Sequence, residues 1–225
     1  MFDGGSLTVV GLGPARPEHM TAEAITILQQ AQQAASTTRI YGLAHAREIA
    51  KQIVPEIKIQ SLDYLYALEG IARPVVYRDL AEQLVRKAKA GVNVVYLVAG
   101  SPLFYNDAVL KIRRLAAKEE ISVRLVHGIS FVEIVLERVH WRGNQGLQLY
   151  SAWNVAMDGI KLSTAAPALL CQLGEFSSGG DALDEGQSQK MLALLGEKLA
   201  TEYGHNHLVT ILYSSGLPEY KSLSK

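Results

Sequence analysis

Cysteine is almost absent from this chain of 225 residues, in which Cys171 is the only one. A single thiol excludes an intrachain disulfide and a cysteine-rich zinc site. No apolar run approaches the roughly 18 residues that a membrane helix needs, and residues 1–5 lack the basic region and apolar core of a signal peptide. We therefore expect a cytoplasmic protein without a membrane span.

Net charge is also absent, because 22 Lys and Arg residues balance 22 Asp and Glu residues. This balance excludes the electrostatic footprint of a nucleic-acid or anionic-membrane protein, so neither partner is expected. A hydrophobic fraction of 48% indicates a packed globular protein. The local basic cluster of Lys111, Arg113, Arg114 and Lys118 fits the solvated face of an amphipathic helix.

Apolar strands alternate with amphipathic helices along the first half of the chain. Strands are expected at 7–10, 36–41, 57–62, 92–98 and 121–126, and helices at 21–34, 44–53, 75–90 and from Asn106 or Asp107 onward. This alternation predicts an α/β fold with a parallel sheet. The near-continuous apolar run Val92–Val98 is typical of a central strand that is buried on both faces.

The pattern changes after residue 127. A helix is expected at 131–138, strands at 147–152, 167–173 and 208–213, a loop at 176–186 and an amphipathic helix at 187–203. We therefore place a domain boundary there. Residues 1–127 form the N-terminal α/β domain, and residues 128–225 form a smaller C-terminal α/β domain.

Two loops that follow apolar strands combine glycine with proline. They are Gly11-Leu12-Gly13-Pro14-Ala15-Arg16-Pro17 and Gly100-Ser101-Pro102-Leu103-Phe104-Tyr105. Glycine lets the backbone approach a ligand closely and proline fixes a turn, so these loops predict a small-molecule site at the carboxyl ends of the strands. The first loop is not a dinucleotide fingerprint, because Arg16 stands where the third glycine belongs. It is not a P-loop either, because no Gly-Lys-Ser/Thr follows.

Three motifs together resemble those of the tetrapyrrole (corrin/porphyrin) methylase family, the class III S-adenosylmethionine-dependent methyltransferases. The first loop is similar to the family's Gly-x-Gly-Pro-Gly-x-Pro, and the second to its Gly-Asp-Pro-x-x-Phe/Tyr. The run His127-Gly128-Ile129-Ser130 is similar to its Pro-Gly-Ile/Val-Ser. The resemblance covers nearly the whole chain. It implies a two-domain fold, with a parallel-sheet N-terminal domain and a smaller mixed-sheet C-terminal domain.

A closer resemblance is to the methylase-like domain that is fused to MazG-type nucleoside triphosphate pyrophosphohydrolases. Ser61–Tyr66 resembles the Phe-Asp-Asp-Leu-Tyr segment of that branch, and Gly146–Ala152 resembles its Gly-Leu-Gln-Leu-Leu-Asp-Ala. Four residues depart from these patterns: Ala15, Ser101, His127 and Ser151 replace Gly, Asp, Pro and Asp. The missing Asp removes a carboxylate from the expected site, which keeps cofactor binding and argues against tetrapyrrole chemistry.

The resemblance implies S-adenosylmethionine as the cofactor and S-adenosylhomocysteine as its product, bound between the two domains. The residues that it assigns to cofactor binding are Pro14, Gly100, Ser101, Pro102, Tyr105, Ser130, Phe131, Gln172 and Ser215. For Gln172, a role in ending a strand is an equally good interpretation. The cofactor carries its own leaving group, so the protein has only to align the methyl group with the nucleophile. The catalytic residues therefore stay unknown, and no metal site is expected.

Two functions remain open on the sequence. One is a methyltransferase that acts on an unidentified small-molecule substrate. The other is a non-catalytic module that binds S-adenosylmethionine or regulates a fused MazG-type nucleotide pyrophosphohydrolase. The resemblance also implies a homodimer, for which Tyr64, Leu65 and Tyr66 supply apolar surface. It further implies a native chain that runs past Lys225 into a final strand, so that the C-terminal domain is truncated here.

Overall fold

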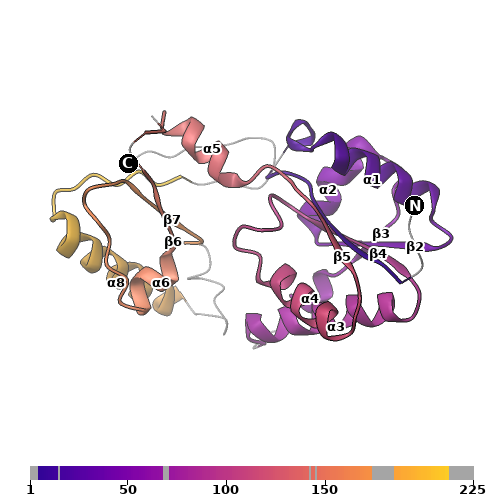
Figure 1. The fold of residues 1–225 in the computed structure, drawn as a ribbon. Coiled ribbons are helices and arrows are strands. Elements are labelled where there is room, and N and C mark those ends of the chain that lie inside the picture. Colours follow the sequence, from indigo (N-terminus) through magenta and orange to yellow (C-terminus); the bar gives the residue numbers. More distant parts are fainter. Residues whose placement is uncertain are drawn as a thin grey trace. The chain divides into compact units, whose positions relative to one another are not determined.

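The structure is a computed structural model of the chain, and it describes residues 5–14, 16–67, 71–141, 143–144, 146–173 and 185–212 (Figure 1). The described residues fall into two compact units. Residues 5–67 and 74–139 form the first unit, and residues 140–212 form most of the second.

The first unit is built on a sheet of five parallel strands in the order β3-β2-β4-β1-β5. They are β1 (Leu7–Gly11), β2 (Thr38–Gly42), β3 (Ile59–Ser61), β4 (Asn93–Val98) and β5 (Val123–Val126). Every residue of β1 and β4 is buried, as the apolar runs predict. The register pairs Gly11 with Val98 and Val10 with Val126, so the carboxyl ends of β4, β1 and the edge strand β5 lie side by side.

Helices cover both faces of this sheet (Figure 1). One core cluster joins the sheet to α3 (Arg73–Lys89) and α4 (Asp107–Lys118), and another joins it to α1 (Ala22–Gln33) and α2 (Ala44–Ile53). The short helices η1 (Pro17–His19) and η2 (Asp63–Leu65) follow β1 and β3, and α5 (Phe131–Arg138) follows β5. The side chains of Thr21, Asn106 and Ser130 cap α1, α4 and α5 by accepting a backbone N–H of the first turn.

The second unit holds two strands, β6 (Gln148–Ser151) and β7 (Ala168–Cys171), with α6 (Ala152–Met157) and α8 (Glu185–Tyr203). Its core comprises Ala152, Val155, Ala156, Leu162 and Leu195. The family resemblance implied a mixed sheet here, whereas the two strands of the described part run parallel. Helix α6 was not predicted, because it follows β6 with no turn residue between them.

The strand predicted at 208–213 is wrong over its described residues, 208–212, which form no strand. Leu208 is 92% exposed. An apolar β-type pattern becomes a strand only when a neighbour accepts its backbone hydrogen bonds, and no described segment does so. Of the loop predicted at 176–186, residues 176–184 lie outside the described residues and the last two belong to α8.

Candidate functional site

Three glycine-bearing loops meet at the carboxyl ends of β1, β4 and β5. A Cβ atom added to Gly128 would lie 2.6 Å from the carbonyl oxygen of Gly100 and 2.7 Å from the carbonyl carbon of Gly11. A Cβ on Gly11 would lie 2.7 Å from the backbone nitrogen of Gly128. Only glycine permits backbones to approach so closely. The convergence expected of the first two loops is present in the structure, and the loop of Gly128 joins them.

The first two loops are joined by backbone hydrogen bonds. The N–H of Gly100 donates to the carbonyl of Gly13 at 2.7 Å, and the N–H of Gly13 donates back at 3.4 Å. Both residues have left-handed φ angles, +77° and +78°, which favour glycine. A Cβ on Gly13 would clash with His19, but a Cβ on Gly100 would meet nothing within 4 Å. The second loop thus presents its backbone to open space, as a ligand cradle does.

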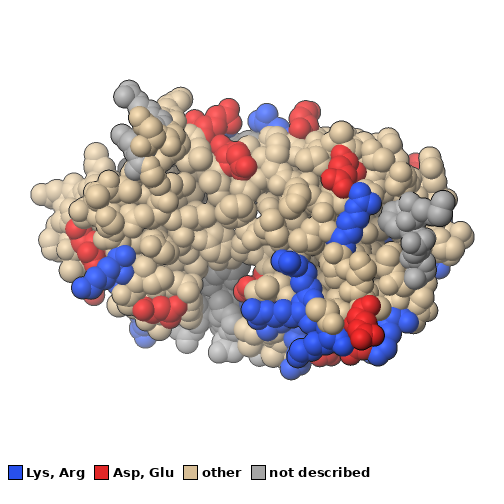
Figure 2. Space-filling model, viewed as in Figure 1, with Lys and Arg blue, Asp and Glu red and all other residues tan. Residues whose placement is uncertain are grey.

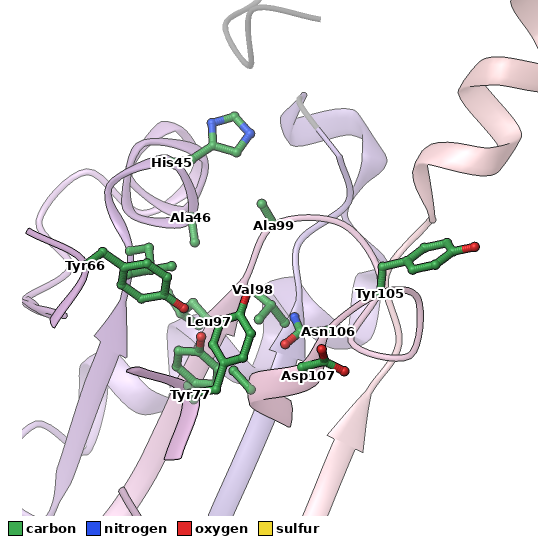
Figure 3. A pocket seen from close by; sticks show the side chains of 13 residues that line it. His45, Ala46, Tyr66, Tyr77, Leu97, Val98, Ala99, Tyr105, Asn106 and Asp107 are labelled. Carbon is green, nitrogen blue, oxygen red and sulfur yellow. The ribbon is translucent and has the colours of Figure 1, made fainter. Parts of the chain in front are cut away.

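A pocket of about 220 Å³ opens beside this junction, within the first unit (Figure 3). Whole small-molecule sites usually exceed about 300 Å³, so this pocket is large enough for part of a ligand. Its walls come from α2, the end of η2, α3, β4, the second loop and the start of α4. The lining residues are Leu43, His45, Ala46, Tyr66, Tyr77, Tyr96, Leu97, Val98, Ala99, Tyr105, Asn106, Asp107 and Ala108.

Three tyrosines dominate one wall of the pocket. The ring centroids of Tyr66 and Tyr77 lie 6.3 Å apart, with the planes tilted by 56°. Tyr96 is only 2% exposed, and its pKa lies far above the usual value, first because burial disfavours the phenolate and then because Tyr66 and Tyr77 lie close by. The Tyr96 hydroxyl therefore stays a neutral hydrogen-bonding group on this wall.

The pocket is poor in positive charge. Among the described residues that line it, none is Lys or Arg, and Asp107 is the one carboxylate. Basic side chains gather instead over the region of α3 and α4 (Figure 2). Helix α4 contributes Lys111, Arg113, Arg114 and Lys118, and none of these lines the pocket.

Asp63 fixes two walls of the pocket relative to each other. Its carboxylate accepts hydrogen bonds from the N–H of Ala44 at 2.8 Å, from Arg47 at 2.5 Å and from Ser61 at 2.6 Å. Leu43, at the N-cap of α2, has no side-chain acceptor, so Asp63 supplies the cap from η2. Partial burial raises the pKa of Asp63, but these hydrogen bonds and the Arg47 charge outweigh it and hold that pKa below its usual value.

The predicted residues of the first loop and the second loop lie at this junction. The Pro14 carbonyl is 3.3 Å from Nε2 of His45. Pro102 is buried against Gly11. The Ser101 hydroxyl accepts from the N–H of Leu103 at 3.3 Å, in a local turn. Ala15 lies outside the described residues.

Other predicted residues have local structural partners. Tyr105 lines the pocket, but its ring points away from Tyr66 and Tyr77 (Figure 3) and lies 6.2 Å from the ring of Phe131. The Ser130 hydroxyl is 3% exposed; it caps α5 and donates to Glu133 at 2.6 Å.

Two further predicted residues belong elsewhere in the chain. Gln172 follows β7 in the second unit with a left-handed φ of 64°, an uncommon conformation for a residue with a side chain. Ser215 lies outside the described residues. The cofactor role of these residues stays a prediction.

Sequence reasoning missed His45, Tyr66, Tyr77, Tyr96 and Asp107 as pocket residues. The sequence pattern indicates a core position for Tyr96, which lies within an apolar strand, and a helix cap for Asp107. Tyr66 and Tyr77 meet only because α3 packs beside the end of η2. No local sequence pattern predicts that packing. The one available signal was the number of tyrosines, ten in the chain.

Comparison with known proteins places these motifs in context. The sequence profile of the family described as Tetrapyrrole (Corrin/Porphyrin) Methylases matches residues 6–151. A methyltransferase/ribosomally synthesized type I borosin cyclic peptide precursor of Serendipita vermifera subsp. bescii is 25% identical over 96% of this chain and 51% of its own length. The cobalamin biosynthesis protein CobIJ of Mycobacterium tuberculosis is 29% identical over 57% of this chain and 27% of its own length. The chain thus spans about half, or less, of the length of these relatives.

The fold is shared with solved structures. The X-ray structure of a cobalamin biosynthetic enzyme, cobalt precorrin-4 methyltransferase, matches 97% of this chain and 84% of its own with a TM-score of 0.60 at 15% identity. No helix among the described residues is both long and apolar enough to cross a bilayer. In the same part of the chain, no three His, Cys, Asp or Glu side chains are grouped to hold a metal ion.

Proposed function

This chain belongs to the tetrapyrrole (corrin/porphyrin) methylase family of S-adenosylmethionine-dependent methyltransferases, and from that premise we propose that its methyl acceptor is a peptide segment. This acceptor differs from the free small molecule expected on the sequence. The observation that carries the proposal is the absence of Lys and Arg from the described residues that line the pocket.

The charge of the pocket separates the two kinds of acceptor. Corrins and porphyrins carry several carboxylates, which proteins bind with arginine and lysine. A peptide backbone is neutral and bonds through N–H and C=O groups, which the hydroxyls of Tyr66 and Tyr77 can match. The Serendipita vermifera relative, which aligns with 96% of this chain, is named both as a methyltransferase and as a cyclic peptide precursor. This name also favours a peptide as the methyl acceptor.

The residues present fit the cofactor. The backbone of Gly100 faces open space where a Cβ would stand, and Asp107 offers a carboxylate to a cationic ligand. S-adenosylmethionine supplies an electrophilic methyl group together with its leaving group. The chain then has to bind the cofactor and the acceptor, align the methyl group with the acceptor atom, and exclude water. Apolar lining from Leu43, Leu97 and Val98 serves the last of these tasks.

A second candidate is the non-catalytic module that binds S-adenosylmethionine without transferring its methyl group. Ser101 favours this candidate, because its hydroxyl is engaged with Leu103 in place of the family's carboxylate. Such a module would serve a fused MazG-type pyrophosphohydrolase, for which the support is the resemblance of two sequence segments alone.

The experiment is a transfer assay on the purified full chain. It is incubated with S-adenosylmethionine and either a pool of random decapeptides or uroporphyrin. S-adenosylhomocysteine release is measured, and peptides are analysed for an added methyl group by mass spectrometry. We expect product with the peptide pool and none with uroporphyrin. The reverse result would contradict the peptide proposal, and cofactor binding with no transfer to either would favour the non-catalytic module.

We also propose a cytoplasmic homodimer. The support is the single cysteine of the chain and the 53% exposed ring of Tyr64. Light scattering at micromolar concentration should give twice the 24.5 kDa chain mass. A monomer mass would contradict the dimer.

A further inference from the structure

We propose that the exposed face of α4, together with the loop before it, binds an acidic segment of the peptide acceptor. The neutral part of that peptide enters the pocket, and its Asp or Glu residues lie outside the pocket on the basic helix. This inference rests on the proposed function, because it names the kind of peptide that the same site accepts.

The solvent-facing side of α4 is strongly basic. The helix carries one carboxylate, Asp107, against four cations: Lys111, Arg113, Arg114 and Lys118. The last three of these cations are exposed, whereas the buried side of the helix packs into the core of the first unit. In the part of the chain that the structure describes, no salt bridge involves any of the four. Their charge is therefore available to an anionic partner.

The positive region continues from α4 onto the end of α3. Lys89 of α3 forms an ion pair with Glu119, which directly follows α4, so the ends of the two helices lie side by side. Arg86 lies one turn before Lys89 and is also exposed. The basic side chains thus gather over one region of the surface (Figure 2).

Exposed apolar side chains lie between the pocket and this basic region. Leu103 and Phe104 of the second loop are 52% and 42% exposed, and Leu110 in the first turn of α4 is 40% exposed. Residues 105–108, which separate them in the chain, line the pocket. Exposed apolar side chains with charged neighbours are typical of protein interaction sites. An acceptor that leaves the pocket here meets apolar surface first and positive charge next.

The length of α4 sets where the acidic residues of the peptide must lie. A helix rises about 1.5 Å per residue, so Arg114 lies about 10 Å along the axis from Asp107, and Lys118 about 16 Å. An extended peptide covers about 3.3 Å per residue. Acidic residues about three and five positions from the residue in the pocket therefore reach Arg114 and Lys118.

The expected gain in affinity is modest and depends on salt. An exposed ion pair strengthens an interaction by about 1.5- to fivefold, so two of them give about 2- to 25-fold. Charges on an exposed surface are screened over about 10 Å at 0.1 M salt and over about 3 Å at 1 M. The preference for an acidic peptide should therefore disappear at high salt.

The test measures binding of fluorescein-labelled peptides to the full chain by fluorescence anisotropy. Each peptide joins a valine and alanine half to a half made of glutamate, glutamine or lysine, in either order, and an oligouridine of equal length is the nucleic-acid probe. We expect the glutamate peptide to bind more tightly than its glutamine counterpart at low salt, and the lysine peptide and the oligouridine to bind more weakly.

Variants locate the binding surface. The double variant Arg114→Gln/Lys118→Gln should lose the preference for glutamate, a loss of about 2- to 25-fold in affinity. The control Lys51→Gln/Lys58→Gln removes the same charge from two exposed lysines at the end of α2 and before β3, and it should keep the preference. Leu110→Ser should weaken the glutamate and glutamine peptides equally. Thermal denaturation checks that each variant is folded.

The outcomes separate this surface from the proposed function. Methyl transfer to the peptides with no preference for glutamate, or an equal loss in the control variant, would overturn the acidic acceptor and leave the methyltransferase standing. Preferred binding of the glutamate peptide without any transfer would keep the surface and contradict the proposed function. Tighter binding of the oligouridine would assign the surface to nucleic acid. If light scattering showed that the Arg114→Gln/Lys118→Gln variant alone lost a dimer, the surface would belong to a second copy of the chain. Either of these last two results would refute the proposal.

Discussion

Replacing Gly100 with Ala separates the conformational role of this glycine from its role as a ligand cradle. Gly91, which follows α3, is a matched control, because its φ is +83° against +78° for Gly100. A Cβ at either position meets nothing within 4 Å. Each alanine must adopt a left-handed φ, which costs about 1 kcal/mol. For a chain of this size, that cost lowers the melting temperature by about 2–4 °C.

Gly100→Ala and Gly91→Ala should then differ in their affinity for the cofactor. The methyl group at position 100 enters the open space beside the second loop, where a bound cofactor would contact the backbone. Losing one such close contact is expected to weaken S-adenosylmethionine binding by about tenfold, equal to about 1.4 kcal/mol. Gly100→Val should abolish binding, and Gly91→Ala should leave it unchanged. Calorimetry and thermal denaturation measure both quantities, and a folded Gly100→Val chain with wild-type affinity would refute the placement of the cofactor.

Three further changes test other parts of the fold. Gly128→Ala puts a Cβ 2.6 Å from a carbonyl oxygen, so overpacking should cost about 1–3 kcal/mol and lower the melting temperature more than Gly100→Ala does. Asp63→Asn should remove a pH dependence of the free energy of unfolding. The folded pKa of Asp63 lies below the unfolded value of 3.8, so its stabilising contribution is present above that value and is lost as the pH falls through the folded pKa. Urea titrations from pH 6 to 3 should therefore show a free energy of unfolding that falls less steeply with acid in the variant than in the wild type. Asn106→Ala should cost about 1 kcal/mol in urea unfolding by removing the cap of α4, and no change would contradict the 3.1 Å hydrogen bond to Val109.

Local patterns predicted most of the first unit. The helices at Ala44–Ile53 and Phe131–Arg138 have the predicted bounds, because the apolar spacing that predicts them lies within the segments themselves. The meeting of the loops at Gly11–Pro17 and Gly100–Tyr105 also followed from sequence, since parallel strands end at one edge of their sheet.

The remaining features depend on partners distant in sequence. Residues 208–212 have the composition of a strand and form none, because a strand is decided by its neighbour. The wall of Tyr66, Tyr77 and Tyr96 arises from the packing of α3 beside β4, and their spacing gives no hint of it. Asp63 lies in a segment that the sequence marks only by its resemblance to the MazG-associated branch, whereas the structure makes it the cap of a helix that begins 19 residues earlier.

The join between Gly13 and Gly100 has a consequence for how the two loops tolerate substitution. Both of its hydrogen bonds run from backbone to backbone, so they do not depend on which side chains surround them. Substitution at position 101, next to this join, therefore leaves both of its hydrogen bonds in place.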